Sequence, residues 1–454
     1  MAINAVTGAG ARSLSLFLVK NSRQASLFIC DVRAIAHARE ARIPKILTNV
    51  YLFFEYSNIS VIKYSIFIQL HTSRYKGLEY LKLNSYLCHT MKHDTNTQKI
   101  VVTLDAGGTN FVFGAMCCGK PIGKSITLPS SAHDLDLCLS TLIRGFEQTI
   151  ESLPEAPVAI SFAFPGPADY RNGVIGGYLP NFPSFRDGVA LGPMLEHRFG
   201  IPVFINNDAD LFAYGEAMGG ALPRINRKLE EAGSAKRYRN MLGFTFGTGF
   251  GFGFVMNGKL NLGDNSCVET FCLKHRDKPE YIVEDGVAIR AVKRVYRELS
   301  GDERTLEPKD IFDIAEGTAE GNAEAAKEAF ATLGRVAGDA MATAVTLMDG
   351  LIVIGGGLSA ASKYFMPALI NEMRSRIRTM SGDVLNRVQM NVYNLDDEAE
   401  FKKFTSGSST KIKVYGTDKE VVYDPEKRIG ITISDIGASN AVALGAYLYA
   451  IDNI

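Results

Sequence analysis

Apolar runs alternate with polar, glycine-containing turns from residue 99 onward. The run KIVVTLD at 99–105 ends in an acid, and NFVFGAM at 110–116 resumes the apolar pattern after a turn that contains Gly107 and Gly108. Apolar runs of this length, bounded by turn residues, predict strands. We therefore expect two strands joined by a tight turn at the start of this region.

Helical spacing appears between the next strand-like runs. LDLCLSTLIRGFEQTIESL at 135–153 has the period of an amphipathic helix, whereas VAISFAFPG at 158–166 and PVFINND at 202–208 predict buried strands. ADLFAYGEAMGG at 209–220 predicts a helix that its glycines end. Strands that alternate with helices predict an α/β fold with largely buried sheets.

The strand-turn-strand pattern then starts again in MLGFTFGTGFGFGFVMNGK, residues 241–259. The elements expected after it are helices at about 283–299 and 322–348, a strand in LIVIGGG at 351–357 and a helix from about Ser362 to Met380. Because the opening pattern occurs twice, we expect two similar halves, each starting with a hairpin, rather than one continuous sheet.

Composition narrows the class of protein. A chain of 454 residues is too long for one hydrophobic core and long enough for two domains. With 46% hydrophobic residues and 49 acidic against 49 basic side chains, it is typical of a globular protein with no general preference for nucleic acid. No uncharged apolar run approaches the roughly 20 residues of a membrane span. Seven cysteines without a CxxC pair do not indicate a disulfide framework, so we expect the reducing cytoplasm.

Residues 1–90 differ from the rest of the chain. They contain three of the 43 glycines and eleven Lys or Arg against four acids, with no clear period. A transit peptide does not fit the aromatic-rich stretch at 51–70, and a DNA-binding helix-turn-helix would need two amphipathic helices that the segment lacks. We favour a third interpretation, in which Met91 is the true start and residues 1–90 are a non-native or disordered extension that is irrelevant to activity.

Each glycine turn allows two interpretations. In a plain hairpin turn, glycine supplies a positive φ. In a phosphate-binding turn, glycine lets successive backbone amides approach an anion and form a concave nest. Thr109, Asn110 and Thr248 would then supply donors, while Asp105 would hold Mg²⁺ through water. A single turn favours the plain interpretation, but two turns together with the motifs below favour phosphate.

Two further motifs bear on the chemistry. In INNDAD, Asn207 and Asp208 end a strand and begin a helix. A carboxylate there is either a helix N-cap or a general base that takes the proton of a sugar hydroxyl, with Asn207 orienting a neighbouring hydroxyl. In IGGGLS, a strand breaks into three glycines before a helix, which allows close approach of adenine and ribose, although such turns often contain glycine for local reasons.

These motifs resemble those of the ROK family of sugar kinases and related repressors. DAGGTN, FPGPAD, LPNFP, INNDAD, FGTGFGFGFVMNGK and IGGGLS occur in the order and approximate spacing of that family, over residues 99–450. The resemblance implies an α/β, two-domain actin-like ATPase fold of the hexokinase and ribonuclease H-like type. Its domains would be 97–211 plus 434–454, and 212–433 with an insertion at 390–430. The last helix, in SDIGASNAVALGAYLYA, would cross back onto the first domain.

The same resemblance implies an ATP-dependent kinase, similar to glucokinase or fructokinase, that uses ATP and Mg²⁺ to phosphorylate a hexose or an N-acetylhexosamine. Asp208 would be the catalytic base. The implied phosphate and adenosine contacts are Asp105, Gly107, Gly108, Thr109 and Asn110 in the first loop, Gly247, Thr248 and Gly249 in the second, and Gly355, Gly356 and Gly357 beside adenosine. The implied sugar contacts are Asn181, Asn207, Asp208, Glu269 and Glu280.

The sequence departs from the family pattern between residues 263 and 285. Glu269 and Glu280 match two acids of that pattern, but its glycine-histidine pair is missing. Cys267, Cys272 and His275 resemble remnants of a zinc cluster, one ligand short of a closed tetrahedral site, so we expect no zinc. An altered sugar preference or lost activity would fit this departure.

A second departure lies in the 390–430 insertion. TSGSSTKIKVYGTDKEVVYDPEKR, at 405–428, predicts a flexible Ser-Gly turn followed by a hairpin. We expect its charge run to form a solvated face, with cover for a sheet edge or a subunit contact as the alternative. The expected partners are a small sugar and a second copy of the chain in a dimer, with neither nucleic acid nor membrane.

Other classes of protein remain as alternatives. A sugar-sensing repressor of the same family would grip DNA, and an inactive homologue would only bind sugar. A Rossmann dehydrogenase is disfavoured because no GxGxxG follows the first strand, and a P-loop kinase is excluded because GxxxxGK[ST] is absent. The sequence does not identify the sugar.

Overall fold

The computed structural model describes residues 2–5, 14–17, 49–55, 63–69 and 99–454. The chain divides into two compact units, Met1–Thr95 and Asn96–Ile454. In the first unit, the described residues form two antiparallel pairs: β1 (Ala2–Ala5) with β2 (Leu14–Phe17), and β3 (Asn49–Glu55) with β4 (Lys63–Gln69). The predicted start at Met91 and most of the predicted 1–90 extension lie outside the described residues, so both stay predictions.

The second unit begins with a five-stranded sheet in the order β11-β8-β5-β6-β7. Its first three strands along the chain are antiparallel neighbours: β5 (Ile100–Ala106), β6 (Asn110–Cys117) and β7 (Lys120–Pro129). β8 (Ala159–Ala163) and β11 (Val203–Asn206) then join in parallel. The amphipathic helix α3 (Leu135–Glu151) buries its apolar stripe on one face, as predicted.

A six-stranded sheet repeats this arrangement, in the order β14-β13-β12-β15-β21-β18. β12 (Met241–Phe246), β13 (Phe250–Met256) and β14 (Lys259–Leu260) are antiparallel neighbours. β15 (Leu351–Gly355), β21 (Arg428–Ile433) and β18 (Asn391–Asn394) continue the sheet in parallel. The prediction of two similar halves, each opening with a hairpin, is therefore confirmed.

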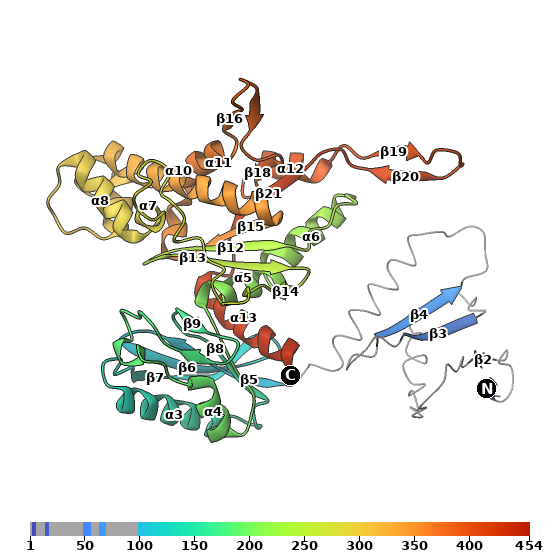
Figure 1. The fold of residues 1–454 in the computed structure, drawn as a ribbon, viewed down its shortest axis with the longest axis horizontal. Helices are drawn as coiled ribbons and strands as arrows, with labels where there is room; N and C mark the ends of the chain where they lie inside the picture. Colours follow the sequence, from blue (N-terminus) through green and yellow to red (C-terminus); the bar gives the residue numbers. More distant parts are fainter. Residues whose placement is uncertain (1, 6–13, 18–48, 56–62, 70–98) are drawn as a thin grey trace. The chain divides into compact units, whose positions relative to one another are not determined.

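Two helices lie between the sheets (Figure 1). α5 (Asp208–Met218) packs on β12 and β13, and α13 (Ala438–Asn453) packs on β5 and β8, so the predicted return of the last helix is confirmed. The two helices also pack tightly on each other: a Cβ on Gly445 would come within 1.9 Å of the Leu211 carbonyl oxygen. The layers therefore run α3, five-stranded sheet, α13 with α5, six-stranded sheet, and a further helical layer.

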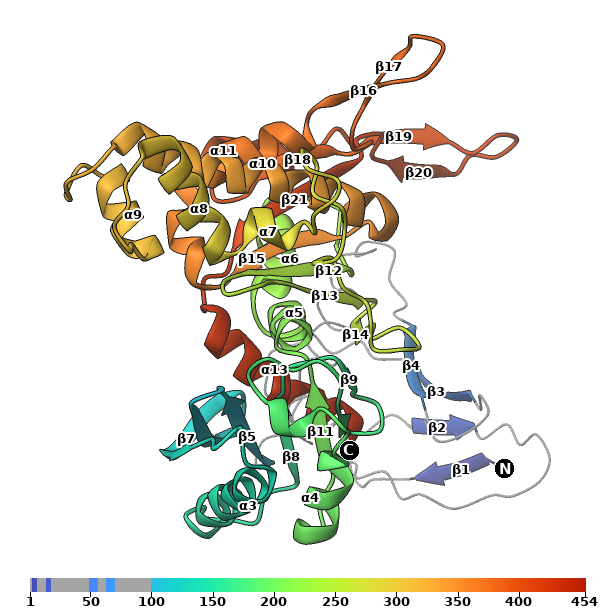
Figure 2. The ribbon, with the colours of Figure 1, turned by 60° about the vertical axis from the view of Figure 1, so that its left-hand side comes forward.

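That further layer packs on the other face of the six-stranded sheet and encloses the larger apolar core (Figure 2). It consists of α7 (Glu284–Val287), α8 (Ile289–Ser300), α9 (Pro308–Ala315), α10 (Ala323–Met348) and α11 (Ser362–Met373). The remaining elements of the unit are β9 (Ala168–Asp169), β10 (Val174–Ile175), α4 (Leu191–Phe199) and α6 (Ala221–Glu231), with 3-10 turns η1 (Pro183–Phe185) and η2 (Gly357–Ala361).

Two helix predictions were wrong in detail. The helix expected over 283–299 is broken, because Ala288 is extended (φ −80°, ψ 170°) and Ile289 donates its amide to the Gly247 carbonyl instead of continuing α7. The helix expected to reach Met380 ends at Met373, because Arg376–Arg378 alternates polar and apolar residues and forms β16, which pairs with β17 (Val384–Asn386).

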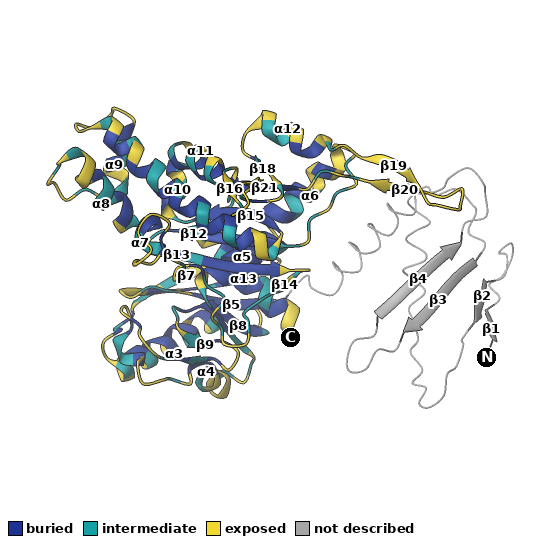
Figure 3. Cartoon of the chain, turned by 45° about the horizontal axis from the view of Figure 1, so that its top comes forward, coloured by how far each residue is buried: buried dark blue, intermediate teal, exposed yellow. Residues whose placement is uncertain are grey.

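The 390–430 insertion is only partly an insertion. Its two ends are strands β18 and β21 of the six-stranded sheet. They are joined by α12 (Glu398–Ser406) and a hairpin of β19 (Thr410–Lys413) and β20 (Glu420–Tyr423). The predicted hairpin and its solvated face are confirmed, and the hairpin pairs with itself rather than with the edge of a larger sheet. All eight of its strand residues are exposed (Figure 3).

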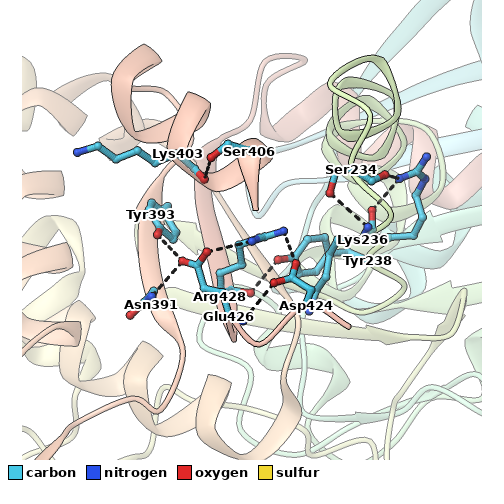
Figure 4. A network of polar contacts seen from close by, with 11 residues as sticks. Ser234, Lys236, Tyr238, Asn391, Tyr393, Lys403, Ser406, Asp424, Glu426 and Arg428 are labelled. Carbon is cyan, nitrogen blue, oxygen red and sulfur yellow. Dashed lines mark hydrogen bonds and ion pairs between the residues drawn. The ribbon is translucent and has the colours of Figure 1, made fainter. Parts of the chain in front are cut away.

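A polar network anchors the base of this hairpin (Figure 4). The fully buried Arg428 forms ion pairs with Asp424 at 2.7 Å and Glu426 at 3.0 Å. Glu426 in turn accepts hydrogen bonds from Asn391 and Tyr393. Both terminal nitrogens of Arg428 are paired in this way, whereas its Nε has no partner among the described residues, so the two ion pairs fix the point at which the hairpin leaves the sheet.

None of the helices in the described part of the chain is both long and apolar enough to cross a membrane.

Candidate active site

The edge of the five-stranded sheet brings two predicted site segments together. Asp105 of β5 is in register with Ala163 of β8, and Ala163 is in register with Asn206 of β11. Because adjacent strands lie about 4.8 Å apart, the ends of β5 and β11 are roughly 10 Å apart at the same edge. Asp105 and the start of α5 therefore face the same space.

Asn207 and Asp208 occupy the N-terminus of α5. Asn207 is the N-cap: its side-chain oxygen accepts the Ala209 amide at 2.8 Å, and Asp208 Oδ1 accepts the same amide at 2.9 Å. The N-cap interpretation is thus correct for Asn207. Asp208 is reachable by solvent but closely surrounded by protein, and this desolvation raises its pKa, with the neighbouring Asp105 adding to the effect.

Tyr170 supports this end of the helix, and the sequence analysis did not single it out. Its hydroxyl donates to the Phe164 carbonyl at 2.9 Å, and Asn207 Nδ2 lies 3.5 Å from that hydroxyl as a donor. Burial raises the pKa of Tyr170, so the hydroxyl stays protonated. The two contacts of Asn207, one through each side-chain atom, fix the orientation of its amide.

Acidic side chains gather beside Asp208. Desolvation, followed by repulsion from Asp208 and Glu284, raises the pKa of Glu269 to about 7. Asp210 is buried, and desolvation with repulsion from Glu269 and Asp208 raises its pKa well above the usual range. Within residues 99–454, Asp210 Oδ1 has no hydrogen-bond partner. Each acid therefore influences the ionisation of another.

The first glycine turn lies at the end of β5. Gly107 donates its amide to the Asn110 carbonyl at 3.1 Å, while Ser130 binds two carbonyls of the turn. Asn181 lies beside the turn, since a Cβ on Gly108 would be 3.1 Å from the Asn181 Cβ. Thr109, Asn110 and Asn181 are exposed, so these predicted phosphate and sugar contacts share one accessible surface.

The second and third glycine turns lie together at the edge of the other sheet. Gly247 donates to the Gly249 carbonyl at 3.0 Å, and Gly355 is in register with Thr245. Gly356 has φ +91°, and a Cβ there would come within 2.3 Å of the Phe246 carbonyl oxygen. Glycine is therefore required at 356 for both reasons.

Glu284 connects the acids to the second turn. Its Oε2 accepts the Phe250 amide at 2.9 Å, and its charge also acts on Glu269. Asp105, Asp208, Glu269 and Glu284 thus form a continuous series of electrostatic neighbours that runs from the first glycine turn to the second. Glu280, by contrast, is exposed on the loop before α7, and Glu284 is the acid that contacts the turn. No periodic pattern in the sequence distinguishes Glu284, which lies two residues before Gly286.

The potential metal ligands of the protein are its His, Cys, Asp and Glu side chains. The described residues contain no group of three or more His, Cys, Asp or Glu side chains placed to hold a metal ion. Cys267 donates to the Asn265 carbonyl at 3.1 Å and His275 Nδ1 accepts the Asp277 amide at 3.2 Å. The absence of zinc stays a prediction. Asp105, an exposed carboxylate at a strand end, fits a magnesium ion held through water.

A cavity of about 560 Å³ lies elsewhere, between α11 and α12, and includes Asn371, Arg374 and Asp397 in its lining. None of its lining residues belongs to the site described above, so the cavity plays no part in it.

Comparison with known proteins gives the chain a family. The model of the ROK family matches residues 101–271 and 280–395. A crystal structure of glucokinase from Parabacteroides distasonis ATCC 8503 is similar over 79% of this chain and 99% of that chain, at 57% identity and a TM-score of 0.75. The fold of a ROK hexokinase from Thermus thermophilus covers 78% of this chain and 99% of its own, with 21% identity and a TM-score of 0.54.

Among curated proteins, both a kinase and a repressor match. Glucokinase from Thermotoga maritima is 26% identical over 304 residues, which are 59% of this chain and 85% of the relative. The xylose repressor of Bacillus spizizenii is 30% identical over 125 residues, which are 27% of this chain and 28% of the repressor.

Proposed function

The chain belongs to the ROK family, and from that membership we propose that it is an ATP-dependent sugar kinase that phosphorylates a hydroxyl group of a hexose or an N-acetylhexosamine. The observation that carries the proposal is the position of Asp208, at one sheet edge with Asp105 and electrostatically connected to the second glycine turn. The similarity to the Parabacteroides distasonis glucokinase supports the same reaction.

Asp208 would act as the general base. Its carboxylate accepts the proton of the sugar hydroxyl while the hydroxyl oxygen attacks the γ-phosphorus and the bond to the bridging oxygen of ADP breaks. A raised pKa makes Asp208 a better proton acceptor than an ordinary carboxylate, provided that it is ionised. A positioned base of this kind contributes roughly 10²- to 10⁴-fold in rate.

The glycine turns would hold the phosphates. Backbone amides in the Gly107–Asn110 and Gly247–Gly249 turns lie on the two sheet edges that flank Asp208, and Gly355, Gly356 and Gly357 would adjoin adenosine. Magnesium bound with ATP would offset the phosphate charge, and Asp105 would hold it through water.

The sugar would lie between Asp208 and the acids next to it. Asn181, Asn207 and Glu269 would bind its hydroxyls, and the contact between Tyr170 and the Asn207 amide supports this role for Asn207. Glu280, which is exposed on the loop before α7, stays a predicted sugar contact.

A coupled ADP-release assay over glucose, fructose, mannose and N-acetylated hexosamines tests the proposal. ADP release that depends on one of these sugars is the expected result. If the sugars bind without ADP release, the chain is the inactive sugar-binding homologue. The repressor alternative requires a shift of upstream DNA in a gel-shift assay, and the match to the xylose repressor is limited to 27% of this chain. The dimer and the cytoplasmic location stay predictions.

A further inference from the structure

The corner between α7 and α8 holds the second glycine turn from outside. The Ile289 amide donates to the Gly247 carbonyl at 2.8 Å, and Arg290 Nη1 donates to the Thr248 carbonyl at 3.5 Å. Glu284 accepts the Phe250 amide at 2.9 Å. Three backbone groups, at Gly247, Thr248 and Phe250, are therefore bound by one short segment of the chain.

Arg290 is itself held at two further points. Its Nη2 donates to Glu284 Oε1 at 2.9 Å and its Nε donates to Asp285 Oδ1 at 2.8 Å. A planar guanidinium with a fixed set of donors can make these contacts and reach Thr248 at the same time, whereas a lysine ammonium cannot. Because two carboxylates neutralise Arg290, its contribution is orientation rather than free positive charge.

Because the peptide bond is planar, a contact that fixes a carbonyl also fixes the direction of the N–H of the next residue. In a trans peptide the carbonyl and the following N–H point in opposite directions. The contact of the Gly247 carbonyl with Ile289 therefore directs the Thr248 N–H away from α8. By the same rule, the contact of the Thr248 carbonyl with Arg290 directs the Gly249 N–H away from α8.

We propose that Arg290 and Glu284 are positioning residues that preset the Thr248 and Gly249 amides to receive the phosphates of ATP. The inference rests on the proposed function, because it concerns the nucleotide of that reaction. We call the contacts of Arg290 and Glu284 with this turn the clamp. Without the clamp, the peptides of a glycine-rich turn can rotate and present a carbonyl oxygen to the phosphate, and the two negatively polarised groups would repel each other.

The first glycine turn has the same arrangement, built from different residues. Ser130 Oγ donates to the Gly108 carbonyl at 2.5 Å, and the Ser130 amide donates to the Thr109 carbonyl at 3.0 Å. The Thr109 and Asn110 amides are consequently directed away from Ser130. In both predicted phosphate turns, therefore, two successive carbonyls accept hydrogen bonds from a segment outside the turn.

Kinetics of Arg290→Met and Arg290→Lys, with Arg297→Met as the matched control, test the proposal. Arg297 is an exposed arginine on the same helix. Both Arg290 variants should lower kcat/KM for ATP about 10- to 100-fold, since small misplacements of binding groups cost this much. KM for the sugar should stay within about twofold and the midpoint of thermal unfolding close to that of the parent chain, because Arg290 is exposed and ion pairs of exposed side chains contribute little to stability.

Glu284→Gln supplies a second, independent variant. Glutamine keeps an acceptor for the Phe250 amide but loses the ion pair with Arg290, so its effect on kcat/KM for ATP should be smaller than that of Arg290→Met. Affinity for ADP, measured by calorimetry, should fall in the same order as kcat/KM for ATP.

Three results would separate the outcomes. Unchanged kcat/KM for ATP and unchanged ADP affinity in Arg290→Met would overturn the clamp while leaving the kinase proposal intact. ADP affinity that falls in the variants, in a chain that phosphorylates no sugar, would support the clamp and overturn the kinase proposal. A parent chain that does not bind ADP at all would overturn both.

Discussion

At the scale of single residues, neighbours decide what each acid can do. Asp208 and Glu269 are ordinary carboxyls in the sequence, but desolvation raises the pKa of both in the fold, with repulsion from Asp105 adding at Asp208 and repulsion from Asp208 and Glu284 adding at Glu269. Asn207 and Tyr170 meanwhile fix the helix end on which Asp208 lies. The chemistry of the site therefore depends on groups that surround the predicted residues.

Asp208→Asn should lower kcat about 10²- to 10⁴-fold, because asparagine cannot accept the hydroxyl proton. Part of the sugar affinity should persist, since Asp208 is only one of the predicted sugar contacts, and the midpoint of thermal unfolding should not fall, since the substitution removes a charge that desolvation disfavours. Steady-state kinetics and calorimetric titration of sugar are the measurements, with Asp187→Asn, an exposed acid, as the control. Full turnover in Asp208→Asn would show that another group is the base.

Glu269 should give the activity a pH dependence near neutrality. Its pKa in the folded protein is about 7, above the ordinary 4.5, so it is protonated below about pH 7 and ionised above it. If the carboxylate accepts sugar hydroxyls, kcat/KM for the sugar rises as pH increases through 7. Glu269→Gln should lose this limb, and an unchanged profile would remove Glu269 from sugar binding.

The free energy of unfolding should change with pH in the opposite direction to kcat/KM. A carboxyl whose pKa is raised on folding favours the folded state less as pH rises from about 4.5 to 7, because the unfolded chain ionises first. Glu269→Gln should therefore weaken the fall in the free energy of unfolding over this range, as measured by denaturant titration.

At the scale of elements, the glycine turns are shaped by what packs against them. The β12–β13 turn is a hairpin turn, as the plain interpretation required, and it also touches the α7–α8 corner and the third turn. These are close contacts between elements distant in the sequence. The turn can therefore be a hairpin and a phosphate site together.

Gly356→Ala should destabilise the protein by more than the roughly 1–2 kcal/mol that a left-handed conformation costs, because its Cβ would also overlap the Phe246 backbone. Gly357→Ala is the matched control, since a Cβ there meets no atom within 4 Å. Denaturant titration of both variants measures the difference. Equal stability of the two variants would contradict this account of Gly356.

At the scale of the whole molecule, the second unit contains every predicted site residue. Its two sheets both begin with antiparallel strands that parallel strands continue, and they enclose α5 and α13, so both predicted phosphate turns are joined through a common helical layer. Two hairpins extend from the six-stranded half, and the exposed side chains of Met380 and Tyr415 lie at their turns. Substitutions in these two hairpins would therefore test whether they form the contact of the predicted dimer.

Truncation to residues 91–454 should leave kcat and KM unchanged, because the two compact units divide close to this point and the site lies in the second. The comparison is between purified full-length and shortened chains in the ADP-release assay. An inactive or aggregated shortened chain would show that the first 90 residues support the fold.

The sequence alone determined the features that depend on neighbouring residues. Apolar periods and glycine turns identified β5, β6, β12, β13, α3 and α10, and their order in the chain indicated the doubled fold. Together with the motif resemblance, they also placed Asp105, Asp208 and the three glycine turns as site candidates. These signals are local, because period and turn chemistry are properties of a few consecutive residues.

Only the tertiary structure decided which distant side chains meet. Glu284 and Arg290 reach the second turn across more than thirty residues of chain, Tyr170 reaches Asn207, and Ile289 breaks a predicted helix to bind Gly247. In the fold, Glu280 is exposed, and β18 and β21 are strands of the six-stranded sheet. No local pattern predicts such contacts, because their free energy comes from groups that folding brings together.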